Sequence, residues 1–441
     1  MTLLYIAFLA FSIIQWFRNK KAISIIFLIF SLCNCFRLLD LGSISGKVAD
    51  YALIYVFVIL VYSYKNINLK GDFVGKLVIT IVGYCTISLI CTIVFTEEKP
   101  ILAFQAYRRC LTLLMYFVIK QLNSKELFDT IKYTLWIVII SALLYILQPL
   151  GIHLYQGGQD ETFYAGEMTR YRNAPNYIHF FILFLLFSNF KISTARKYIC
   201  LLILLCGLIL PMSRTNIFTL GVVIIVYLLS QREMKAVFGL TIVCLIAFAI
   251  FGSYWEYRMG STDTSNDIMS ALSMRNYKDY DGSGGTFQFR IAMLMERIDY
   301  LWKSQNIWFG IGFPHELSAY TRSHFNFMVG TSLNTEYGML RCYIETPDIS
   351  WVTLLMRLGL IGIILYMSMF FYMCKRFFKF HMPLGVCALL WQTYLLLTSF
   401  SGDVIGMSAF NNYCLMFVLY NYIIHYHGIN KDRTEQLNRI A

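Results

Sequence analysis

The residue best placed for chemistry is an arginine in a short break between two apolar runs. Arg214 lies in the segment PMSRTN (211–216), with Ser213 and Thr215 beside it. Such a tight segment holds the guanidinium in place, and a fixed guanidinium can grip a phosphate or pyrophosphate through two of its nitrogens. The alternative interpretation of Arg214 is an interfacial anchor.

Four further arginines lie next to apolar segments. Arg170 and Arg172 precede an apolar run within the segment RYRNAPNYIHF. Arg290 and Arg297 lie in FQFRIAMLMERIDYLW (287–302), whose apolar residues recur at helical spacing. This spacing predicts an amphipathic helix, with both arginines on one face, at a membrane–water boundary or over a cavity. Both could instead extend to lipid phosphates, an interpretation that fits Arg297 better than Arg290.

Three arginines lie inside apolar runs, where a charge costs roughly 2.5–3.5 kcal/mol on insertion scales. They are Arg108, Arg109 and Arg357. We expect Arg108 and Arg109 to pair with acidic residues of other helices or to line a polar cavity. Among the acids, Asp50 is interpreted as a helix-start residue and Asp403 as a solvated loop residue.

The overall composition indicates a membrane protein. Of the 441 residues, 58% are hydrophobic and only 14% are charged, and the mean hydropathy is +0.59. A soluble domain averages about 45–50% apolar and about 25% charged residues. Because one globular core cannot bury this excess, the composition excludes a cytosolic enzyme, a nucleic-acid-binding domain and a secreted disulfide scaffold.

The apolar runs have lengths typical of membrane-spanning helices and lack the alternation of barrel strands. We therefore predict an all-α, polytopic integral membrane protein with about thirteen transmembrane helices, within a range of about eleven to fourteen. The predicted spans are 2–17, 22–36, 48–64, 77–95, 100–119, 131–150, 176–190, 198–212, 215–230, 236–252, 350–373, 384–400 and 408–427.

These spans divide the chain into three regions and give it an orientation. An N-terminal transmembrane bundle (1–252) is followed by one large outer loop (253–349) and by C-terminal spans with a cytoplasmic tail (350–441). Alternate loops collect Lys and Arg, whereas the short loops between them carry only Arg37, Lys47, Lys99, Arg170, Arg172 and Arg214. Because short cytoplasmic loops are rich in positive charge, we expect the amino terminus outside and the carboxyl terminus inside. The net charge of +12 then follows from topology, with no nucleic acid as partner.

Three motifs, in this order, resemble the superfamily of bacterial O-antigen polymerases and O-antigen ligases. They are Arg172-Asn173-Ala174-Pro175-Asn176 at the start of a span, Ser213-Arg214-Thr215 between two spans, and an outer loop in which Arg290 is followed by NIWFGIGF (306–313) and PDISWVTLLMRLGLIG (347–362). The resemblance covers about residues 165–375. Hydropathy alone supports the same architecture for the remainder of the chain.

Two positions depart from the family pattern. The ligases usually carry a His ahead of the span that ends in Gly-Leu-Ile-Gly, and this chain has Asp348 there. This difference favours a polymerase over a ligase. The family's Asn-Pro pair is Asn306-Ile307 here, so the outer-loop motif is degenerate.

The resemblance implies a GT-C-like glycosyltransferase of the bacterial inner membrane, with its active site facing the periplasm and with no metal or cofactor. The donor would be an undecaprenyl-pyrophosphate-linked glycan, and a hydroxyl of a second lipid-linked repeat unit would attack its anomeric carbon. Pyrophosphate leaves readily if its charge is held, so the protein must supply electrostatic stabilisation and a base. Besides membrane lipids, the implied partners are a flippase and a chain-length regulator.

The resemblance also implies roles for single residues. The candidates for holding the pyrophosphate are Arg172, Arg214 and Arg290, and the further substrate contacts are Arg170 and Asn176. Asp348 is the candidate base, and the alternates for that role are His324, His315 and Glu336. Asp348 could equally cap the helix that follows it, since Pro347-Asp348-Ile349-Ser350 is a reasonable helix start.

Two alternative functions stay open. Within the enzyme class, a ligase would transfer the glycan to lipid A-core. The main non-enzyme alternative is a lipid-linked oligosaccharide flippase, which would also need many spans and embedded arginines. Transporters are commonly built from two similar halves, and this sequence shows no such repeat.

Overall fold

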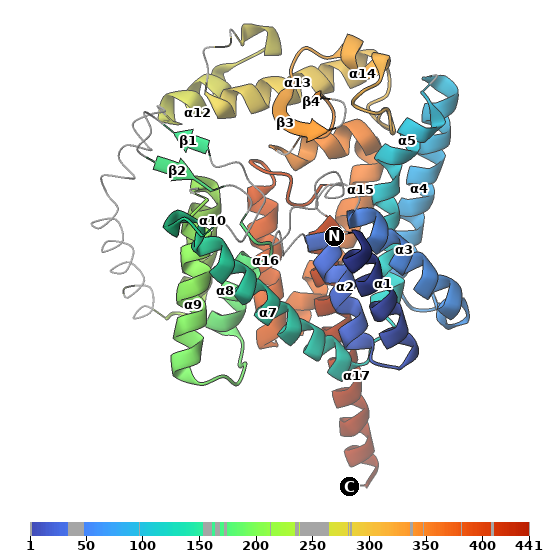
Figure 1. Ribbon diagram of the computed structural model, residues 1–441, viewed down its shortest axis with the longest axis vertical. Coiled ribbons are helices and arrows are strands. Elements are labelled where there is room, and N and C mark those ends of the chain that lie inside the picture. The colour runs from blue at the N-terminus through green and yellow to red at the C-terminus, as the bar shows by residue number, and fades with distance from the viewer. Residues whose placement is uncertain are drawn as a thin grey trace.

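The computed structural model describes residues 2–33, 48–96, 98–152, 161–163, 168–171, 174–211, 213–233, 238, 264–280, 282, 285–335, 338–346, 348–380, 382–406 and 410–440. Within these residues helices make up nearly all the regular structure, as the predicted all-α class requires (Figure 1). Two short antiparallel hairpins are added, β1 (Glu161–Phe163) with β2 (Met168–Arg170) and β3 (Val329–Thr335) with β4 (Gly338–Cys342).

The helices of the first half are α1 (Thr2–Phe17), α2 (Lys21–Cys33), α3 (Val48–Ser63), α4 (Phe73–Phe95), α5 (Pro100–Tyr107), α6 (Met115–Ile119), α7 (Ser124–Ile146), α8 (Ile178–Phe187), α9 (Thr194–Ile209) and α10 (Arg214–Ser230). Those of the second half are α12 (Thr264–Ser273), α13 (Thr286–Lys303), α14 (Ala319–His324), α15 (Ser350–Lys379), α16 (Pro383–Thr398) and α17 (Phe410–Ile440).

Local signals set several helix starts. Asn123 and Glu126 form a capping box at α7, in which each side chain accepts the backbone N–H of the other residue. Asp72 accepts a backbone N–H in the first turn of α4. Pro100 and Pro383 occupy the first positions of α5 and α16, where a missing N–H costs nothing.

Four stretches of the described chain are long and apolar enough to cross a membrane. They are Phe73–Phe95, Pro100–Ile119, Ser124–Leu150 and Ser350–Lys379. Shorter apolar helices of the described chain include α1, α2, α8, α10 and α16. A multi-pass membrane protein follows, while the number thirteen stays a prediction. Nearly all of the predicted span 236–252 lies outside the described residues.

The first half of α17 lies at the centre of the helix bundle. Its residues from Tyr413 to Leu419 are fully buried, and α17 packs against α2, α6, α7 and α16. Farther along, α17 leaves the bundle toward the C-terminus (Figure 1). Beside it, α15 packs along α4 and α16. The buried half of α17 thereby joins helices from both halves of the chain.

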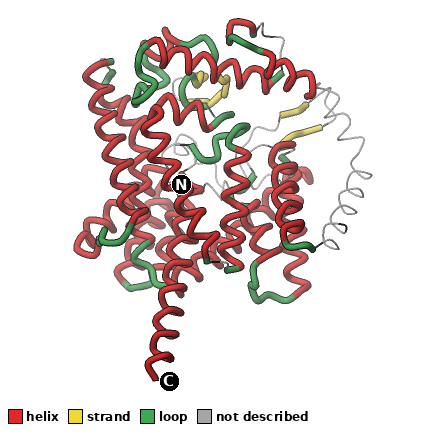
Figure 2. The backbone as a smooth tube through the Cα atoms, turned by 180° about the vertical axis from the view of Figure 1, so that it is seen from behind, coloured by secondary structure: helices red, strands yellow, loops and turns green. Residues whose placement is uncertain are grey.

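One end of the bundle is covered by α12, α13, α14 and the β3–β4 hairpin, here called the cap (Figures 1 and 2). The helix predicted over 287–302 is α13, so that prediction is confirmed to within one residue at each end. A small core holds the cap onto α15. It contains Leu301, Ile344, Val352 and Met356.

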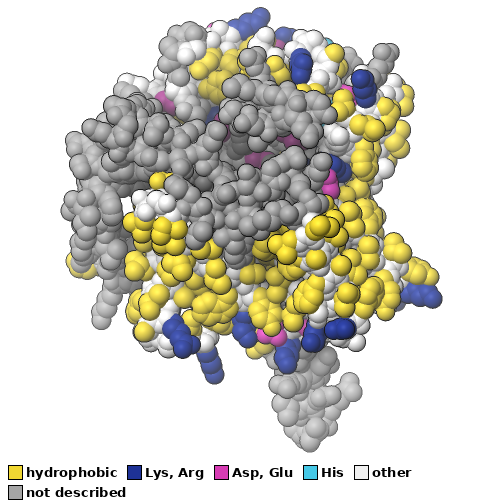
Figure 3. Space-filling model, in the orientation of Figure 1, with side chains coloured by type: hydrophobic (Ala, Val, Ile, Leu, Met, Phe, Trp, Pro, Cys, Tyr) yellow, Lys and Arg dark blue, Asp and Glu magenta, His cyan; other side chains and the backbone are white. Residues whose placement is uncertain are grey.

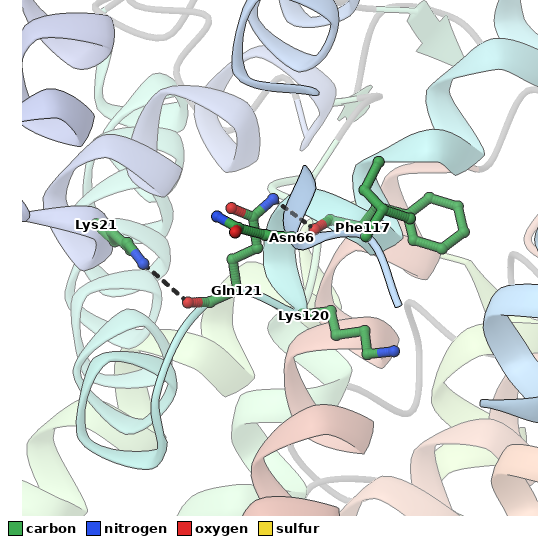
Figure 4. A pocket seen from close by; sticks show the side chains of 6 residues that line it. Lys21, Asn66, Phe117, Lys120 and Gln121 are labelled. Carbon is green, nitrogen blue, oxygen red and sulfur yellow. Dashed lines mark hydrogen bonds between the residues drawn. The ribbon is translucent and has the colours of Figure 1, made fainter. Parts of the chain in front are cut away.

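The loops at the opposite end carry the charges predicted to be cytoplasmic. Lys120 Nζ lies 2.6 Å from Asp72 Oδ2, and Lys21 Nζ donates a 3.0 Å hydrogen bond to Gln121 O. With Asn66, several of these residues line a small pocket (Figure 4). Figure 3 shows Lys and Arg at this edge, below a broad hydrophobic band. The loops that were assigned to one side of the membrane therefore lie at the same end of the helix bundle. Which compartment this end faces stays a prediction.

Two predicted spans are interrupted helices. The span predicted over 100–119 consists of α5, the 3₁₀ segment η3 (Arg108–Leu114) and α6. Helix α15 is broken at Gly359, where φ is 61°. Mid-helix 3₁₀ stretches often mark functional or strained sites, and both interruptions lie close to the residues described next.

Candidate active site

The structure brings together two of the predicted site residues, Arg290 and Asp348. Arg290 lies near the start of α13, and Asp348 lies just before α15. Arg290 Nη2 is 3.5 Å from Asp348 Oδ1, and both side chains are partly buried. Among the described residues, the buried Nε of Arg290 has no hydrogen-bond partner. An unpaired buried donor is costly, and the 18% of the Arg290 side chain that is exposed can reach an anionic ligand.

Asp348 does not cap α15, which was the alternative explanation for an acid at this position. The N-cap residue is Ile349, and no side chain makes a capping hydrogen bond there. The backbone N–H of Asp348 donates to Thr346 Oγ1 at 3.1 Å. The contact that the Asp348 carboxylate makes is thus the one with Arg290.

The start of α13, and with it Arg290, is held by α12. The Asp267 carboxylate accepts the backbone N–H groups of Phe287 and Gln288 at 3.0 and 2.9 Å. An acid at a helix N-terminus satisfies amides that lack partners within the helix and interacts favourably with the helix dipole. Arg290 therefore projects from a fixed helix end.

Arg297 does not extend to lipid phosphates, and that interpretation was wrong. Its side chain is fully buried. It donates to the carbonyls of Phe327 at 2.6 Å and Tyr343 at 2.7 Å, and it pairs with Glu296. Its guanidinium also lies over the Phe325 ring, 4.3 Å from the centroid. These partners compensate the buried charge, and they tie α13 to the rest of the cap.

Glu316 shapes the loop between β4 and α15. Its carboxylate accepts the backbone N–H groups of Tyr343, Ile344 and Glu345 at 2.7, 3.0 and 2.7 Å. Burial raises the pKa of Glu316 above its usual value, and Arg357 and these amides limit the rise. One buried side chain thus sets the backbone path of this loop.

Glu345, in the same loop, joins arginines from two different spans, and it was not identified from the sequence. Its carboxylate lies 2.9 Å from Arg109 Nη1 in η3 and 3.1 Å from Arg357 Nη2 in α15. Arg357 is buried and also donates to the carbonyls of Gly312 and Pro314 at 3.2 and 2.6 Å. Burial acts to raise the pKa of Glu345, but Arg109 and Arg357 hold it below its usual value. Glu345 is therefore ionised at neutral pH.

The predicted pairing of the two adjacent span arginines with acids is confirmed. Arg108 Nη1 is 2.8 Å from Asp50 Oδ2, while Arg109 pairs with Glu345. Asp50 lies in the first turn of α3, as predicted. Both pairs join segments far apart in the sequence.

Glycines from the segments 306–313 and 347–362 of the third motif meet where α15 is broken. Gly310 and Gly359 both have positive φ, at 72° and 61°. A Cβ built on Gly310 would lie 2.7 Å from Gly359 N and from Met356 O. The two backbones are therefore too close for a side chain, and this explains a glycine in each segment.

Hydrogen bonds across this joint satisfy the broken backbone. They run from Ile311 N to Met356 O, from Leu360 N to Ile307 O and from Ile361 N to Trp308 O, at 2.7, 3.0 and 3.1 Å. Non-helical backbone at membrane depth is tolerated where it has such partners. The joint fixes α15, and with it the loop that carries Asp348, against the segment that follows α13.

Asp403 is not a solvated loop residue, contrary to the expectation from sequence. It follows α16 and is partly buried beside Ser350, whose hydroxyl donates to Gly402 O at 3.0 Å and accepts the N–H of Val404 at 3.0 Å. Burial raises the pKa of Asp403 to about 7, while Ser350 opposes the rise and Glu345 adds to it. A carboxyl that can gain or lose a proton near neutral pH thus lies at the start of α15.

Of the predicted site residues, Arg290 and Asp348 are in contact in the described part of the chain. Arg214 is the first residue of α10, and Asn176 lies just before α8. Arg170 is the last residue of β2, and only its backbone is described. The predicted site residues Arg172 and Glu336 lie outside the described residues.

His324, an alternate base, lies far from Arg290. It is exposed, and its ring lies 4.6 Å from that of Tyr320 and 5.5 Å from that of Tyr300. Arg290 and Tyr300 are ten residues apart on α13, which is a rise of about 15 Å. We therefore do not expect His324 to contact the group held by Arg290 directly, and its role in binding substrate stays a prediction.

His315 is the other alternate histidine, and it offers a donor rather than a base. Its Nδ1 accepts the backbone N–H of Leu317 at 3.2 Å, so the proton of the neutral ring is on Nε2. Burial and the nearby Arg357 lower the pKa of His315. A neutral ring with Nδ1 occupied has no acceptor left for a substrate proton.

The arrangement can hold an anion on guanidinium groups and accept a proton on a carboxylate. Arg290 is one guanidinium with an unused donor, and the carboxylates are those of Asp348 and Asp403. Among the described residues, no group of three His, Cys, Asp or Glu side chains could hold a metal ion. These are the parts needed for displacing a charged leaving group.

Comparison with known proteins bears on the same region. Residues 199–367 match the model of the family described as O-antigen ligase, and this range includes Arg214, Arg290, Glu345 and Asp348. No curated protein matches the chain. The resemblance seen in the sequence motifs is confirmed at the level of this family, which does not separate polymerases from ligases. Residues 199–367, less than half of the 441-residue chain, are thus similar to a family described as O-antigen ligase.

Proposed function

We propose that this protein is an O-antigen polymerase. It joins polyprenyl-pyrophosphate-linked oligosaccharide repeat units at the periplasmic face of the inner membrane, as a metal-independent glycosyltransferase. The observation that carries the proposal is the contact of Arg290 with Asp348, with a buried Arg290 Nε left open. A guanidinium with unused donors next to a carboxylate suits a step in which an anion leaves and a proton is removed.

In the proposed reaction, a hydroxyl of the acceptor sugar attacks the anomeric carbon of the donor sugar. A new C–O glycosidic bond forms, and the bond from the anomeric carbon to the lipid pyrophosphate breaks. The Asp348 carboxylate takes the hydroxyl proton. Arg290 holds the charge that develops on the pyrophosphate, assisted by Arg214 at the start of α10 and by Arg172. The Arg290 side chain already lies beside Asp348, so little reorganisation of this pair is needed.

Asp348 also supports a polymerase over a ligase. The ligases that the motifs resemble usually have a His in this place, and His315, a loop histidine of the described structure, has its Nδ1 occupied. A ligase nevertheless remains the second candidate, because the family model that matches residues 199–367 bears that description. A flippase is a third, and it would need no base beside Arg290.

The test is the gel profile of surface glycolipid from a strain that lacks the gene. Loss of a polymerase should leave core bearing a single repeat unit, because flipping and attachment continue. Bare core would overturn the proposal, and accumulation of finished polymer or of undecorated lipid-linked repeats would then distinguish a ligase from a flippase.

Complementation with single variants links this phenotype to the site. Arg290→Ala and Asp348→Asn should reach the membrane at wild-type levels and still leave single-repeat core. Arg322→Ala is the matched control, because Arg322 is an exposed arginine of the same cap and should restore full-length polymer. Wild-type polymer with Arg290→Ala would remove Arg290 from the reaction.

We also propose the orientation of the protein in the membrane, from the distribution of its basic loops. With the basic loops in the cytoplasm, the cap and the Arg290–Asp348 pair face the periplasm, where flipped lipid-linked repeats are found. A flippase would supply these substrates, and a chain-length regulator would set when the polymer is released.

A further inference from the structure

We propose that Arg109 forms a second anion site, which binds the pyrophosphate of the acceptor lipid while Arg290 binds that of the donor. This inference rests on the proposed function, because only a reaction between two lipid-linked substrates needs two such sites. It assigns a substrate contact to the interrupted span formed by α5, η3 and α6, outside the residues that the sequence motifs indicated.

The charges around Arg109 leave one guanidinium in excess. Arg108 has a carboxylate of its own in Asp50. Arg357 is 1% exposed, and such a buried charge requires the partner that it has in Glu345. Arg109 shares that same carboxylate. Two guanidinium groups thus divide one negative charge, and the one nearer to solvent is Arg109.

The other carboxylates near this loop do not neutralise Arg109. Glu98 accepts the backbone N–H of His315, and Glu316 is occupied by three backbone amides of the loop. Within the described ranges, Glu345 is the acid that comes within 4 Å of an Arg109 nitrogen. Asp403 influences Arg109 only from farther away.

Arg109 also has donors to spare. Its side chain is 47% exposed, and in the described part of the chain its side-chain hydrogen bond goes to Glu345 from Nη1. A guanidinium has five N–H groups in a planar fork that fits phosphate oxygens. The remaining face of Arg109 is therefore available to a phosphate without breaking the contact with Glu345.

The position of Arg109 suits a lipid headgroup. It lies in a 3₁₀ segment within a membrane span, where a charge is costly unless it serves a function. On the preceding helix, Ile101 and Phe104 are 73% and 48% exposed, so apolar surface for a prenyl chain lies on the same span, within a rise of about 12 Å from Arg109. A lipid with an anionic head and a long apolar tail matches this combination.

The spacing of the two proposed sites fits two substrates. Glu345 contacts Arg109 and Asp348 contacts Arg290, and three residues of chain span at most about 11 Å. The two anion sites thus flank one short loop. In the acceptor lipid, the attacking sugar is separated from the pyrophosphate by the length of the oligosaccharide, so its pyrophosphate cannot share the donor's site.

The experiment measures how many polyprenyl pyrophosphate molecules the full-length protein binds. The protein is placed in nanodiscs of phosphatidylcholine, and the probe is undecaprenyl pyrophosphate without sugars. The wild type should bind two equivalents. Arg109→Gln and Arg290→Gln should each retain one, and Arg322→Gln, the control, should retain two.

Two results would overturn the second site. Arg109→Gln could keep both equivalents, which would make Arg109 a contact for bulk phospholipid. Arg109→Gln could instead bind no undecaprenyl pyrophosphate and still unfold at the wild-type temperature. That result would show that the two sites are not independent.

A kinetic measurement distinguishes failure of the Arg109 site from failure of the proposed function. In a reconstituted polymerisation assay, Arg109→Gln should raise the half-saturating concentration of the acceptor at least about tenfold (about 1.4 kcal/mol) and leave that of the donor unchanged. An equal rise for both substrates contradicts the assignment. If the gene deletion leaves bare core, the proposed function fails, whatever number of equivalents binds.

Discussion

Replacing Gly359 with alanine should disrupt the joint between α15 and the segment 306–313. The added Cβ would meet Gly310 N and would lie 2.5 Å from both the carbonyl carbon and the oxygen of Trp308. These are backbone atoms, so no side chain can rotate away to make room. In addition, Gly359 has a φ of 61° and a ψ of −171°, a conformation essentially restricted to glycine, where a residue with a side chain costs of order 1–3 kcal/mol.

The expected loss of stability follows from these contacts. To admit the Cβ, the two segments must separate, and this breaks the three hydrogen bonds that cross the joint. At about 1 kcal/mol for each bond, together with the cost of this backbone conformation, the free energy of unfolding should fall by about 4–6 kcal/mol. Few single substitutions cost that much.

The matched control is Gly83→Ala in α4. Gly83 is also a glycine of a membrane helix, but an added Cβ there would have nothing within 4 Å. Alanine is the better helix former by roughly 0.5–1 kcal/mol, so this variant should be as stable as the wild type or slightly more stable.

The assay is thermal unfolding of detergent-solubilised protein, followed by fluorescence-detected size exclusion. Gly359→Ala should lower the midpoint by on the order of 5–10 °C and abolish polymer formation, because the joint positions Asp348. If Gly359→Ala and Gly83→Ala have the same midpoint, the reasoning about the joint is refuted.

Other expected outcomes concern buried charges. Arg297→Ala leaves the buried Glu296 without its partner and should cost about 3–5 kcal/mol, so immunoblots of membranes should show little of it, unlike Arg290→Ala. Glu316→Gln turns an amide NH₂ toward backbone N–H groups, and its unfolding midpoint should fall by an amount equivalent to about 1–3 kcal/mol. The pKa of Asp403 is raised to about 7, so the folded chain holds a proton that the unfolded chain releases above pH about 4. Stability should therefore fall as the pH rises from about 4 to about 7, and Asp403→Asn should flatten this dependence in unfolding midpoints measured across that range.

The membrane architecture could be predicted because hydropathy and helical periodicity are local properties. The spacing of Ile291, Leu294, Ile298 and Leu301 indicates the helix that the structure shows as α13. The clustering of Lys and Arg in alternate loops predicts which loops share an end, and Lys21 and Lys120 do meet there.

The break in α15 shows the limit of local signals. The hydropathy pattern predicts a continuous span through Gly359, because an interrupted helix is as apolar as an intact one. The reason for the glycine is a backbone 49 residues earlier in the chain, at Gly310, that approaches too closely for a Cβ. The motif can be recognised from sequence, but its physical cause cannot.

The sequence by itself determined the class of molecule, the helical cap element and the residue types at the candidate site, since each follows from composition or from neighbours along the chain. The pairing of charges was decided only by the tertiary structure. Arg109 and Glu345 are separated by 236 residues, and Arg297 was buried rather than directed to lipid. A charge near a membrane can face lipid, water, a substrate or an opposite charge, and the packing of distant helices selects among these environments.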